Sequence, residues 1–327
     1  MRALLCRSLE EGIDGLRVED IPPPGLSPDG VRIEVHAAAM NFADTLLVRG
    51  RYQEKPALPF APGLEAAGVV LEVAPGVQHV LPGERVVALL DHGGFAEEVV
   101  ARASDVVRIP EEIDDATAAA IPIAYLTSYL ALVERARLQP REVLVVFGAS
   151  GGVGLSAVEV GHGLGARVIA VASSHDKLAT ALDRGADDAV SYTEEDVAAR
   201  IEELAGGADV IYDPVGGELF EAGLHAINPG GRILLVGFAS GTVPQIPANH
   251  LLVKDAAALG FSIGQFRRHQ PDRVRAALAE LLRMTVEGRL HPLVSQVLSL
   301  DRAVEGLREL QAGRTVGKLV VRPRVTD

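Results

Sequence analysis

The pattern of apolar and polar residues changes near Asp114, and the segments on either side predict different folds. Before that residue, short apolar or alternating runs such as MRALLC, VRIEVHAA and RVVALL are separated by turn signals at Pro62-Gly63, Pro75-Gly76 and Pro82-Gly83. Each run has the length of a strand. Residues 1 to about 121 are therefore expected to form an antiparallel or barrel-like β domain.

The segment that follows predicts an α/β fold. Residues 114–138 are rich in Ala and Leu and predict helices, which Pro122 separates. Helical stretches then begin near Gly152, Asp176 and Glu194, and two more, at 217–227 and near His250, lead to the last strands. Repeated βα units of this size predict a parallel sheet with helices on both faces. The predicted strands are residues 143–147, 167–172, 188–192, 209–213, 232–237 and 257–261.

The C-terminal part of the chain is expected to return to the first domain. It holds an amphipathic helix at 272–288, a strand-like run at 297–300, a short helix from Asp301 and a last strand at 317–323. The chain has 327 residues, which exceeds one average domain. We therefore expect two domains, with the tail completing the first.

A turn of small residues follows the predicted strand at 143–147. The segment FGASGGVG is a variant of G-x-G-x-x-G, with Ala149 in the first glycine position and Gly151 and Gly154 in the others. Small residues let the backbone approach a pyrophosphate, which binds free N–H groups at the helix N-terminus. A tight strand-to-helix connection is the alternative, but the flanking elements favour a dinucleotide. The predicted contacts are Ala149, Ser150, Gly151, Gly152, Val153 and Gly154.

The end of the next strand indicates which dinucleotide binds. An NAD enzyme usually has a carboxylate there, which accepts a hydrogen bond from the ribose 2′-hydroxyl. This chain has Ser173 and Ser174 instead, whose hydroxyls can bind a 2′-phosphate, and the cation Lys177 follows. These residues favour NADPH as the cofactor. A helix cap at Ser174 or Asp176 with a solvated Lys177 is the alternative, and both interpretations can hold together.

Charge and composition exclude other classes of function. The net charge of −13 argues against nucleic-acid or membrane-surface partners. Cys6 is the only cysteine and is expected to be a packed thiol, so disulfides within the chain and cysteine-rich zinc sites are excluded. The N-terminal apolar run is too short for a signal peptide, and no run reaches about 18 apolar residues. We expect a soluble cytoplasmic protein.

With the cofactor motif in place, the whole chain resembles the medium-chain dehydrogenase/reductase superfamily. Its markers include HAAAMNFADTLLVRGRY, PGLEAAGVV, PGERVVAL, GGFAEEVVA and VGKLVV, in this order. The resemblance implies a GroES-like β-barrel catalytic domain at residues 1–123 and a Rossmann NADP-binding domain at 124–262. It implies that residues 263–327 return to complete the catalytic domain. An active-site cleft between the domains is part of the same expectation.

Two positions depart from the zinc-dependent members of that superfamily. Those members place a ligand Cys where this chain has Asn41, and a ligand His where it has Leu64. Neither residue is a strong zinc ligand, and the four-cysteine lobe for structural zinc is missing too. In Asn41, Asp44 and Tyr52 the chain resembles the zinc-free quinone oxidoreductases. The resemblance therefore implies an enzyme without a metal.

Without a Lewis acid, a substrate carbonyl oxygen needs hydrogen-bond donors as negative charge develops on it. Asn41 offers an amide N–H and Tyr52 a phenolic O–H that could also donate a proton, and the resemblance places both near the nicotinamide. Asp44 is expected to order Asn41 or its neighbours. The alternatives are that Asn41 is a helix cap or turn residue, and that Asp44 is an early-helix carboxylate facing the macrodipole.

The resemblance implies further cofactor contacts. Thr127 would lie against the nicotinamide ribose, and Tyr192 near the adenine or the 2′-phosphate. Gly237 and Phe238 would lie near the nicotinamide, and Lys318 near the cofactor. The alternatives are a capping or core Thr127, a half-buried strand Tyr192 and a surface cation at Lys318.

The leading interpretation is hydride transfer from NADPH to a quinone or a similar conjugated carbonyl, with a small electrophile as the only substrate partner. One alternative is an enoyl-type reductase that saturates the C=C bond of an acryloyl thioester or an enone. Another is a non-catalytic NADPH-binding protein. The resemblance also implies a homodimer joined through the nucleotide-binding domains, since the apolar strand at 257–261 would lie at a sheet edge.

Overall fold

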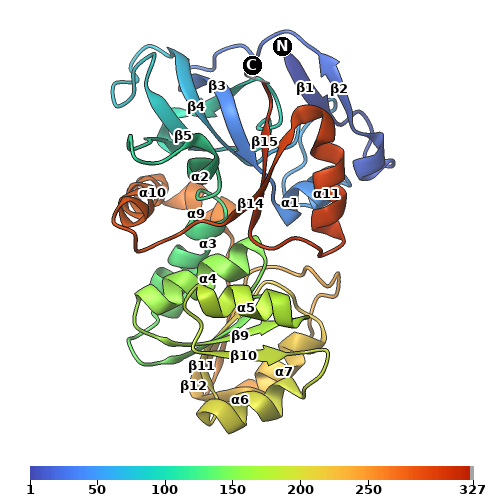
Figure 1. Cartoon of the computed structure of the whole chain (residues 1–327), viewed down its shortest axis with the longest axis vertical. Helices are drawn as coiled ribbons and strands as arrows, with labels where there is room; N and C mark the ends of the chain where they lie inside the picture. The colour runs from blue at the N-terminus through green and yellow to red at the C-terminus, as the bar shows by residue number, and fades with distance from the viewer. Residues whose placement is uncertain (325–327) are drawn as a thin grey trace. The chain divides into compact units, whose positions relative to one another are not determined.

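The computed structural model describes residues 1–324 and divides into two compact units (Figure 1). Unit 1 comprises Met1–Ile123, His269–Gly288 and the chain from Pro292 onward. Unit 2 comprises Ala124–Arg268 and Arg289–His291. Both contain helices and strands, so the predicted α/β class is confirmed.

Unit 1 is built on a β-sheet in the order β14-β15-β3-β4-β5-β7, with β6 paired to β3. The pair β14–β15 is parallel and the other pairs are antiparallel. The C-terminal strand β15 lies beside β3, where Val320 pairs with Ala39. The strands are β1 (Arg2–Leu5), β2 (Arg17–Asp20), β3 (Gly30–Ala39), β4 (Glu65–Val73), β5 (Arg85–Leu89), β6 (Glu98–Arg102), β7 (Val106–Arg108), β14 (Val294–Ser299) and β15 (Lys318–Arg322).

The sequence pattern of β3 explains how it packs. Val31, Ile33 and Val35 are buried, and the residues between them are partly exposed, which is the two-residue period of a strand. Strand β4 pairs with β3 and approaches it very closely at Gly68. A Cβ at Gly68 would lie 1.8 Å from the carbonyl oxygen of Glu34, so only glycine permits this approach. Cys6, directly after β1, is buried as predicted.

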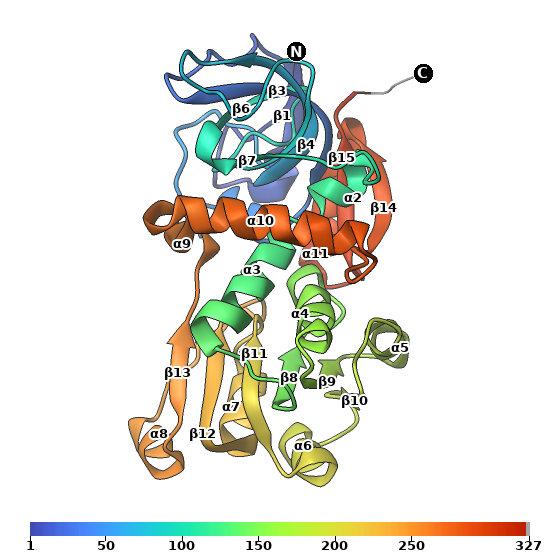
Figure 2. The same cartoon turned by 90° about the vertical axis from the view of Figure 1, so that its left-hand side faces the viewer.

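Helices complete unit 1. The predicted amphipathic helix is α10, which begins with Pro271 and buries Val274, Leu278 and Leu281. Figure 2 shows α10 as a long orange helix. The helices are α1 (Phe42–Leu47), α2 (Asp115–Ala119), α10 (Pro271–Val286) and α11 (Ala303–Gln311), with 3₁₀ turns at Gly12–Gly15, Ala103–Asp105 and Leu300–Arg302.

Unit 2 is a parallel sheet covered by helices. In the described chain its strands run in the order β10-β9-β8-β11-β12-β13, and every pair is parallel (Figure 2). Its core includes the fully buried Val145, Ile169 and Ile211. The strands are β8 (Val143–Phe147), β9 (Arg167–Ala172), β10 (Asp188–Ser191), β11 (Ala208–Asp213), β12 (Ile227–Leu235) and β13 (Ala257–Gly260).

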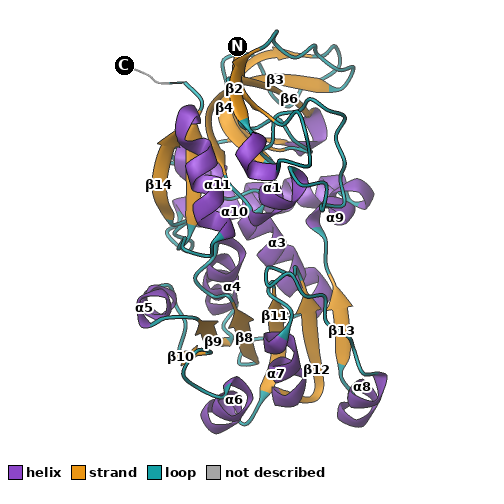
Figure 3. Cartoon of the chain, turned by 90° about the vertical axis from the view of Figure 1, so that its right-hand side faces the viewer, coloured by secondary structure: helices purple, strands orange, loops and turns teal. Residues whose placement is uncertain are grey.

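The connecting segments of unit 2 are helices on both faces of the sheet (Figure 3). Pro122 lies between α2 and α3, as predicted, and a π-helical segment, Ala131–Ala136, continues α3. The helices are α3 (Ala124–Leu130), α4 (Gly152–Gly163), α5 (His175–Asp183), α6 (Val197–Ala205), α7 (Glu218–Ala226), α8 (Ala248–Lys254) and α9 (Ile263–His269).

Element limits differ from the predicted ones where capping or sheet pairing decides them. Helix α6 begins after Asp196, three residues later than Glu194, because the Asp196 carboxylate accepts the N–H of Ala199. Strand β12 begins at Ile227, well before residue 232, because Ile227 pairs with Ala208 on β11. The short helix α9 was not predicted, since seven residues carry little periodic signal, and α1 was predicted only as the alternative in which Asn41 is a helix cap.

No helix among residues 1–324 has the length and apolar character needed to cross a membrane.

Candidate functional site

The start of α1 holds two of the predicted catalytic residues. Strand β3 ends at Ala39, and Asn41 is the N-cap of α1. The backbone N–H of Asn41 donates to Asp44 Oδ2 at 2.8 Å, and the N–H of Gly63 donates to Asp44 Oδ1 at 3.0 Å. A carboxylate in the first turn also faces the positive end of the helix. Asp44 therefore orders Asn41 and is at the same time an early-helix carboxylate.

The side chain of Asn41 belongs to a buried polar cluster with Glu65 and Lys318. Lys318 Nζ lies 2.6 Å from Asn41 Oδ1 and 2.8 Å from Glu65 Oε1. Asn41 Nδ2 donates to the same Glu65 oxygen at 2.7 Å. Glu65 is fully buried and Lys318 is 4% exposed, so the alternative of a surface cation at Lys318 is wrong.

Burial controls the electrostatics of this region. It raises the pKa of Asp44 to about 7, against the opposing effect of the two backbone N–H donors and of Lys318. Burial and the neighbouring charges of Asp44 and Glu54 raise the pKa of the Tyr52 phenol. Tyr52 is therefore a neutral donor at pH 7. Unit 1 thus brings together Asn41, Asp44 and Lys318, with Tyr52 within the field of Asp44.

In unit 2, the small-residue turn joins β8 to α4. Gly148 has φ +59°, and a Cβ at Gly154 would lie 2.1 Å from the Gly148 carbonyl oxygen. Gly151 is the N-cap of α4, and within the described residues no side chain makes a capping hydrogen bond to this helix. The first backbone N–H groups of an α-helix have no acceptor within that helix. The turn therefore presents N–H groups and the positive end of a 12-residue helix.

The order of strands places this turn at the switch point of the sheet. From the neighbouring strands β8 and β11, the chain continues to β9 on one side of the sheet and to β12 on the other. Ligands of such sheets bind at the carboxyl ends of these two strands. Asp213 ends β11, and its Oδ1 accepts the N–H groups of Val215 and Gly216 at 2.8 Å each. Its carbonyl accepts the N–H of Gly237 at 3.4 Å. Asp213 thereby fixes the turn that carries Gly237 and Phe238.

The carboxyl ends of β9 and β10 bring the predicted 2′-phosphate residues together. Lys177 Nζ donates to Ser173 Oγ at 3.0 Å. Ser174 is the N-cap of α5, although among the described hydrogen bonds its hydroxyl makes no capping bond. The N–H of Tyr192 donates to the carbonyl oxygen of Ala172, and Tyr192, which directly follows β10, is 42% exposed.

A hydroxyl network next to Thr127 had no signal in the sequence. Thr127 lies on α3 and is 6% exposed. Its neighbour Ser128 donates to the Val153 carbonyl at 2.9 Å and lies 2.8 Å from Ser156 Oγ and 3.0 Å from the Tyr212 hydroxyl. Ser128 therefore ties α3 to the first turn of α4, where the small-residue turn ends.

Glu65 was also missed, although the sequence carries a signal for it. The run EAAGVV opens with a carboxylate and is otherwise strongly apolar, and a charge at the start of a buried strand needs a partner. Its second oxygen accepts the N–H of Ile123 at 2.7 Å. Both oxygens of Glu65 are thus used inside unit 1.

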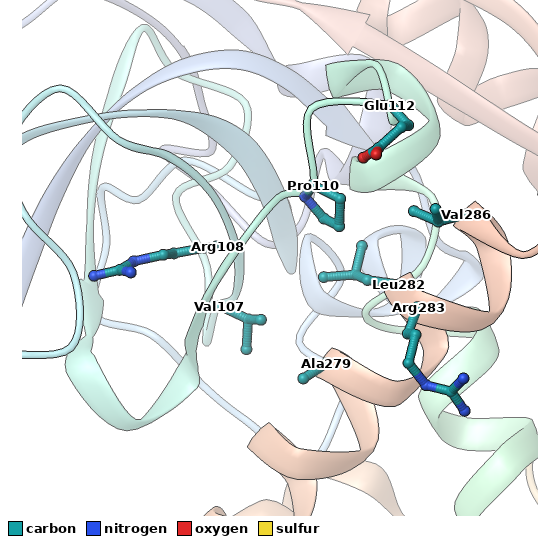
Figure 4. Close-up of a pocket in the computed structure, with 8 residues that line it drawn as sticks. All are labelled: Val107, Arg108, Pro110, Glu112, Ala279, Leu282, Arg283 and Val286. Atoms are coloured by element: carbon teal, nitrogen blue, oxygen red, sulfur yellow. The ribbon is translucent and has the colours of Figure 1, made fainter.

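Two other features of the described residues bear on the site. Across residues 1–324, no three His, Cys, Asp or Glu side chains gather as a possible metal site. A pocket of about 310 Å³ lies in unit 1, and none of its lining residues is a predicted site residue (Figure 4). It is lined by Val107, Arg108, Pro110, Glu112, Ala279, Leu282, Arg283 and Val286.

Comparison with known proteins gives the family. The family model of the alcohol dehydrogenase GroES-like domain matches residues 27–111, and that of zinc-binding dehydrogenases matches residues 152–283. Quinone oxidoreductase-like protein 2 of Bos taurus is 36% identical over 323 residues, which cover 98% of this chain and 92% of that protein. The chain belongs to the medium-chain dehydrogenase/reductase superfamily, in its quinone oxidoreductase branch. The residues that the zinc-binding dehydrogenase model matches, 152–283, include neither Asn41 nor Leu64, the two zinc-ligand positions.

Solved structures of this branch have the same fold. The Escherichia coli quinone oxidoreductase complexed with NADPH is 28% identical, with a TM-score of 0.93 over 99% of this chain and all of that one. The quinone oxidoreductase of Thermus thermophilus, also solved with NADPH, is 33% identical, with a TM-score of 0.81 over 98% of this chain and all of that one. The predicted family, the GroES-like domain and the Rossmann sheet are confirmed.

Proposed function

We propose that this protein is a zinc-independent oxidoreductase that transfers hydride from NADPH to a quinone or a similar conjugated carbonyl. The observation that carries the proposal is the buried polar cluster around Asn41. An amide whose oxygen and nitrogen are both held by charged partners stands where zinc-dependent relatives place a metal ligand. The quinone oxidoreductase relatives support the same substrate class.

The residues of unit 2 fit NADPH. The turn at Ala149, Ser150, Gly151, Gly152, Val153 and Gly154 leads into the start of α4, and its backbone is so tightly packed that a Cβ at Gly154 would lie 2.1 Å from the Gly148 carbonyl oxygen. The paired Ser173 and Lys177 supply a hydroxyl and a cation for a 2′-phosphate, with Ser174 and Tyr192 beside them. Thr127, Gly237 and Phe238 would line the nicotinamide end. The two solved relatives that carry NADPH support this assignment.

NADPH supplies the hydride, and the residues of unit 1 act on the substrate oxygen. As hydride adds to a conjugated carbonyl, negative charge develops on that oxygen. Asn41 donates an amide N–H to it, and the neutral Tyr52 phenol donates an O–H and can give up the proton. Asp44 fixes the backbone of Asn41 and leaves the chemistry to the amide.

The residues at the two ligand positions support a mechanism without zinc. The Asn41 oxygen is bonded to Lys318, and Leu64 has no donor atom. The only thiol of the chain, Cys6, is buried, with a pKa that burial raises, so it offers no thiolate.

A panel of acceptors tests the proposal. Purified protein, with its zinc content measured, is mixed with NADPH and a 1,4-quinone, an enone or an acryloyl thioester, and NADPH absorbance is followed. We expect steady oxidation with the quinone, with NADPH preferred over NADH, and no loss of activity after chelation. Oxidation restricted to the thioester or enone would mean an enoyl-type reductase. No oxidation with any acceptor would mean a non-catalytic NADPH-binding protein, and stoichiometric zinc required for activity would overturn the metal-free mechanism.

We also propose a homodimer formed through unit 2. Within residues 1–324, β13 pairs with β12 alone and so lies at the sheet edge. The adjacent helix α8 exposes Leu252 and Val253, which are 81% and 84% accessible. An unpaired edge and exposed apolar side chains favour pairing with a second copy. Light scattering should give two chains of 34.4 kDa, and a monomer at every concentration would contradict the proposal.

A further inference from the structure

The ion pair between Lys318 and Glu65 lies directly against the Asn41 amide. Lys318 opens β15, Glu65 opens β4 and Asn41 precedes α1, so three separate elements of unit 1 converge on one amide. The three bonds that join these side chains measure 2.6 to 2.8 Å. The charged partners are 4% and 0% exposed, so water does not compete for these bonds.

The chemistry of the partners leaves the amide one orientation. An ammonium group only donates hydrogen bonds, and an ionised carboxylate only accepts them. The Asn41 oxygen must therefore face Lys318, and its nitrogen must face Glu65. The flipped amide would set N–H against ammonium and oxygen against carboxylate, which loses two charge-assisted bonds at once.

We propose that Lys318 and Glu65 are positioning residues of the substrate site, which hold the Asn41 amide in its donating orientation. Lys318 then acts through Asn41, by the bond to the amide oxygen that its other bond, to Glu65, holds in place. The second amide N–H of Asn41 makes only a long bond, at 3.4 Å, to the Ala39 carbonyl oxygen, which a substrate oxygen can replace. By drawing electron density to the amide oxygen, the ammonium also makes this N–H a stronger donor. This role rests on the proposed function of Asn41.

Buried ion pairs contribute little to stability when compared with apolar residues of similar size. Stability therefore does not account for burying Lys318 and Glu65. Holding the neighbouring Asn41 amide in one orientation does account for the burial of this ion pair.

Kinetics of Lys318→Met give the first test. Removing one oxyanion donor commonly costs about a hundredfold or more in rate, but a quinone is intrinsically reactive and needs less help. With a quinone acceptor, kcat should therefore fall on the order of tenfold. The dissociation constant of NADPH should stay near that of the wild type. In an Asn41→Ala background, Lys318→Met should cause no further loss, because the group it positions is gone. The matched control is Lys177→Met, which should weaken NADPH binding.

Two kinetic results would overturn the proposal. If Lys318→Met weakens NADPH binding as Lys177→Met does and leaves kcat unchanged, Lys318 is a cofactor ligand. If its effects on kcat multiply with those of Asn41→Ala, Lys318 acts independently of the amide.

A spectroscopic test needs neither substrate nor cofactor. The chain has three asparagines, Asn41, Asn228 and Asn249, so ¹⁵N-asparagine labelling gives three side-chain amide signals. Asn41→Ala identifies one of them by its loss. Lys318→Met should shift that signal and leave the other two in place, and an unshifted signal would overturn the proposal. If no acceptor oxidises NADPH, the proposed function fails, and this spectrum still shows whether Lys318 holds the Asn41 amide.

Lys318→Met alone leaves the Glu65 charge buried without its partner and could prevent folding. The double variant Lys318→Met with Glu65→Gln removes both charges and keeps an acceptor for the N–H of Ile123. A folded double variant should show the same tenfold loss of kcat. Wild-type kcat in that variant would show that the ion pair has no role in positioning Asn41.

Discussion

The two candidate sites differ in how far the protein itself satisfies their polar groups. In unit 1 the Asn41, Glu65 and Lys318 side chains bond to one another and are nearly inaccessible. In unit 2 the start of α4 has no side-chain cap among the described residues, and Tyr192 and Phe238 are 42% and 39% exposed. The first arrangement suits a preorganised set of donors for a developing charge, and the second suits a surface completed by a large anionic ligand.

The largest effect that we expect is on the pH dependence of the free energy of unfolding, to which Asp44 in unit 1 contributes. Burial raises the pKa of Asp44 from 3.8 to about 7, so between these values the folded chain holds a proton that the unfolded chain has lost. The free energy of unfolding should therefore fall as pH rises from about 4 to about 7 and level off above. At about 1.4 kcal/mol for each pKa unit, Asp44 accounts for about 4 kcal/mol of this total decrease in the free energy of unfolding.

Denaturant unfolding of wild type and Asp44→Asn across this pH range measures that contribution. The variant should lose stability at low pH, and its slope between about pH 4 and 7 should be shallower than that of the wild type. Parallel curves for the two proteins would mean that Asp44 titrates normally in the fold.

In unit 2, Gly154→Ala should have the next largest effect. Its Cβ would lie 2.1 Å from the Gly148 carbonyl oxygen, so the turn must move away from the pyrophosphate. Overpacking of this kind commonly costs about 1–3 kcal/mol, and we expect NADPH binding to weaken about a hundredfold. Gly163→Ala, at the other end of α4, is the control, because its Cβ meets nothing within 4 Å. Equal NADPH affinities for the two variants in a fluorescence titration would show that NADPH binding does not need glycine at 154.

Lys177→Ala should have a smaller effect that depends on the cofactor. Losing one charge-assisted bond costs about 1.5–3 kcal/mol, so NADPH binding should weaken roughly tenfold to a hundredfold. NADH lacks the 2′-phosphate and should bind almost unchanged. Titrations with both cofactors check this, and equal losses would make Lys177 a structural residue of α5.

The same difference between the sites explains what the sequence could predict. The turn from Ala149 to Gly154 is contiguous, and Ser173 and Lys177 are close in the sequence. A local pattern can therefore predict both parts of the proposed cofactor site. Asn41, Glu65 and Lys318 come from three elements, and the first and the last are 277 positions apart. Pairing across such distances depends on how β3, β4 and β15 align, which no local pattern encodes.

The fold itself could be predicted from the spacing of apolar residues and from the turn signals between them. Strands such as β8 and β9 have the predicted limits, since they are short apolar runs bounded by turns. The larger errors fell on short helices and on the starts of β12 and β14, where a cap or a neighbouring strand sets the boundary. Ser128 was missed because a serine within a helix has no distinctive pattern until Tyr212 and Ser156 lie beside it.

The Asn41 amide is proposed to hold the substrate oxygen during hydride transfer, and the positioning role of Lys318 and Glu65 depends on it. The decisive quantity is kcat of Asn41→Ala at saturating NADPH, measured with a quinone and with a less electrophilic enone. We expect a loss on the order of tenfold with the quinone, a larger loss with the enone and unchanged NADPH affinity. Wild-type kcat with both acceptors would mean that the amide does not hold the substrate oxygen.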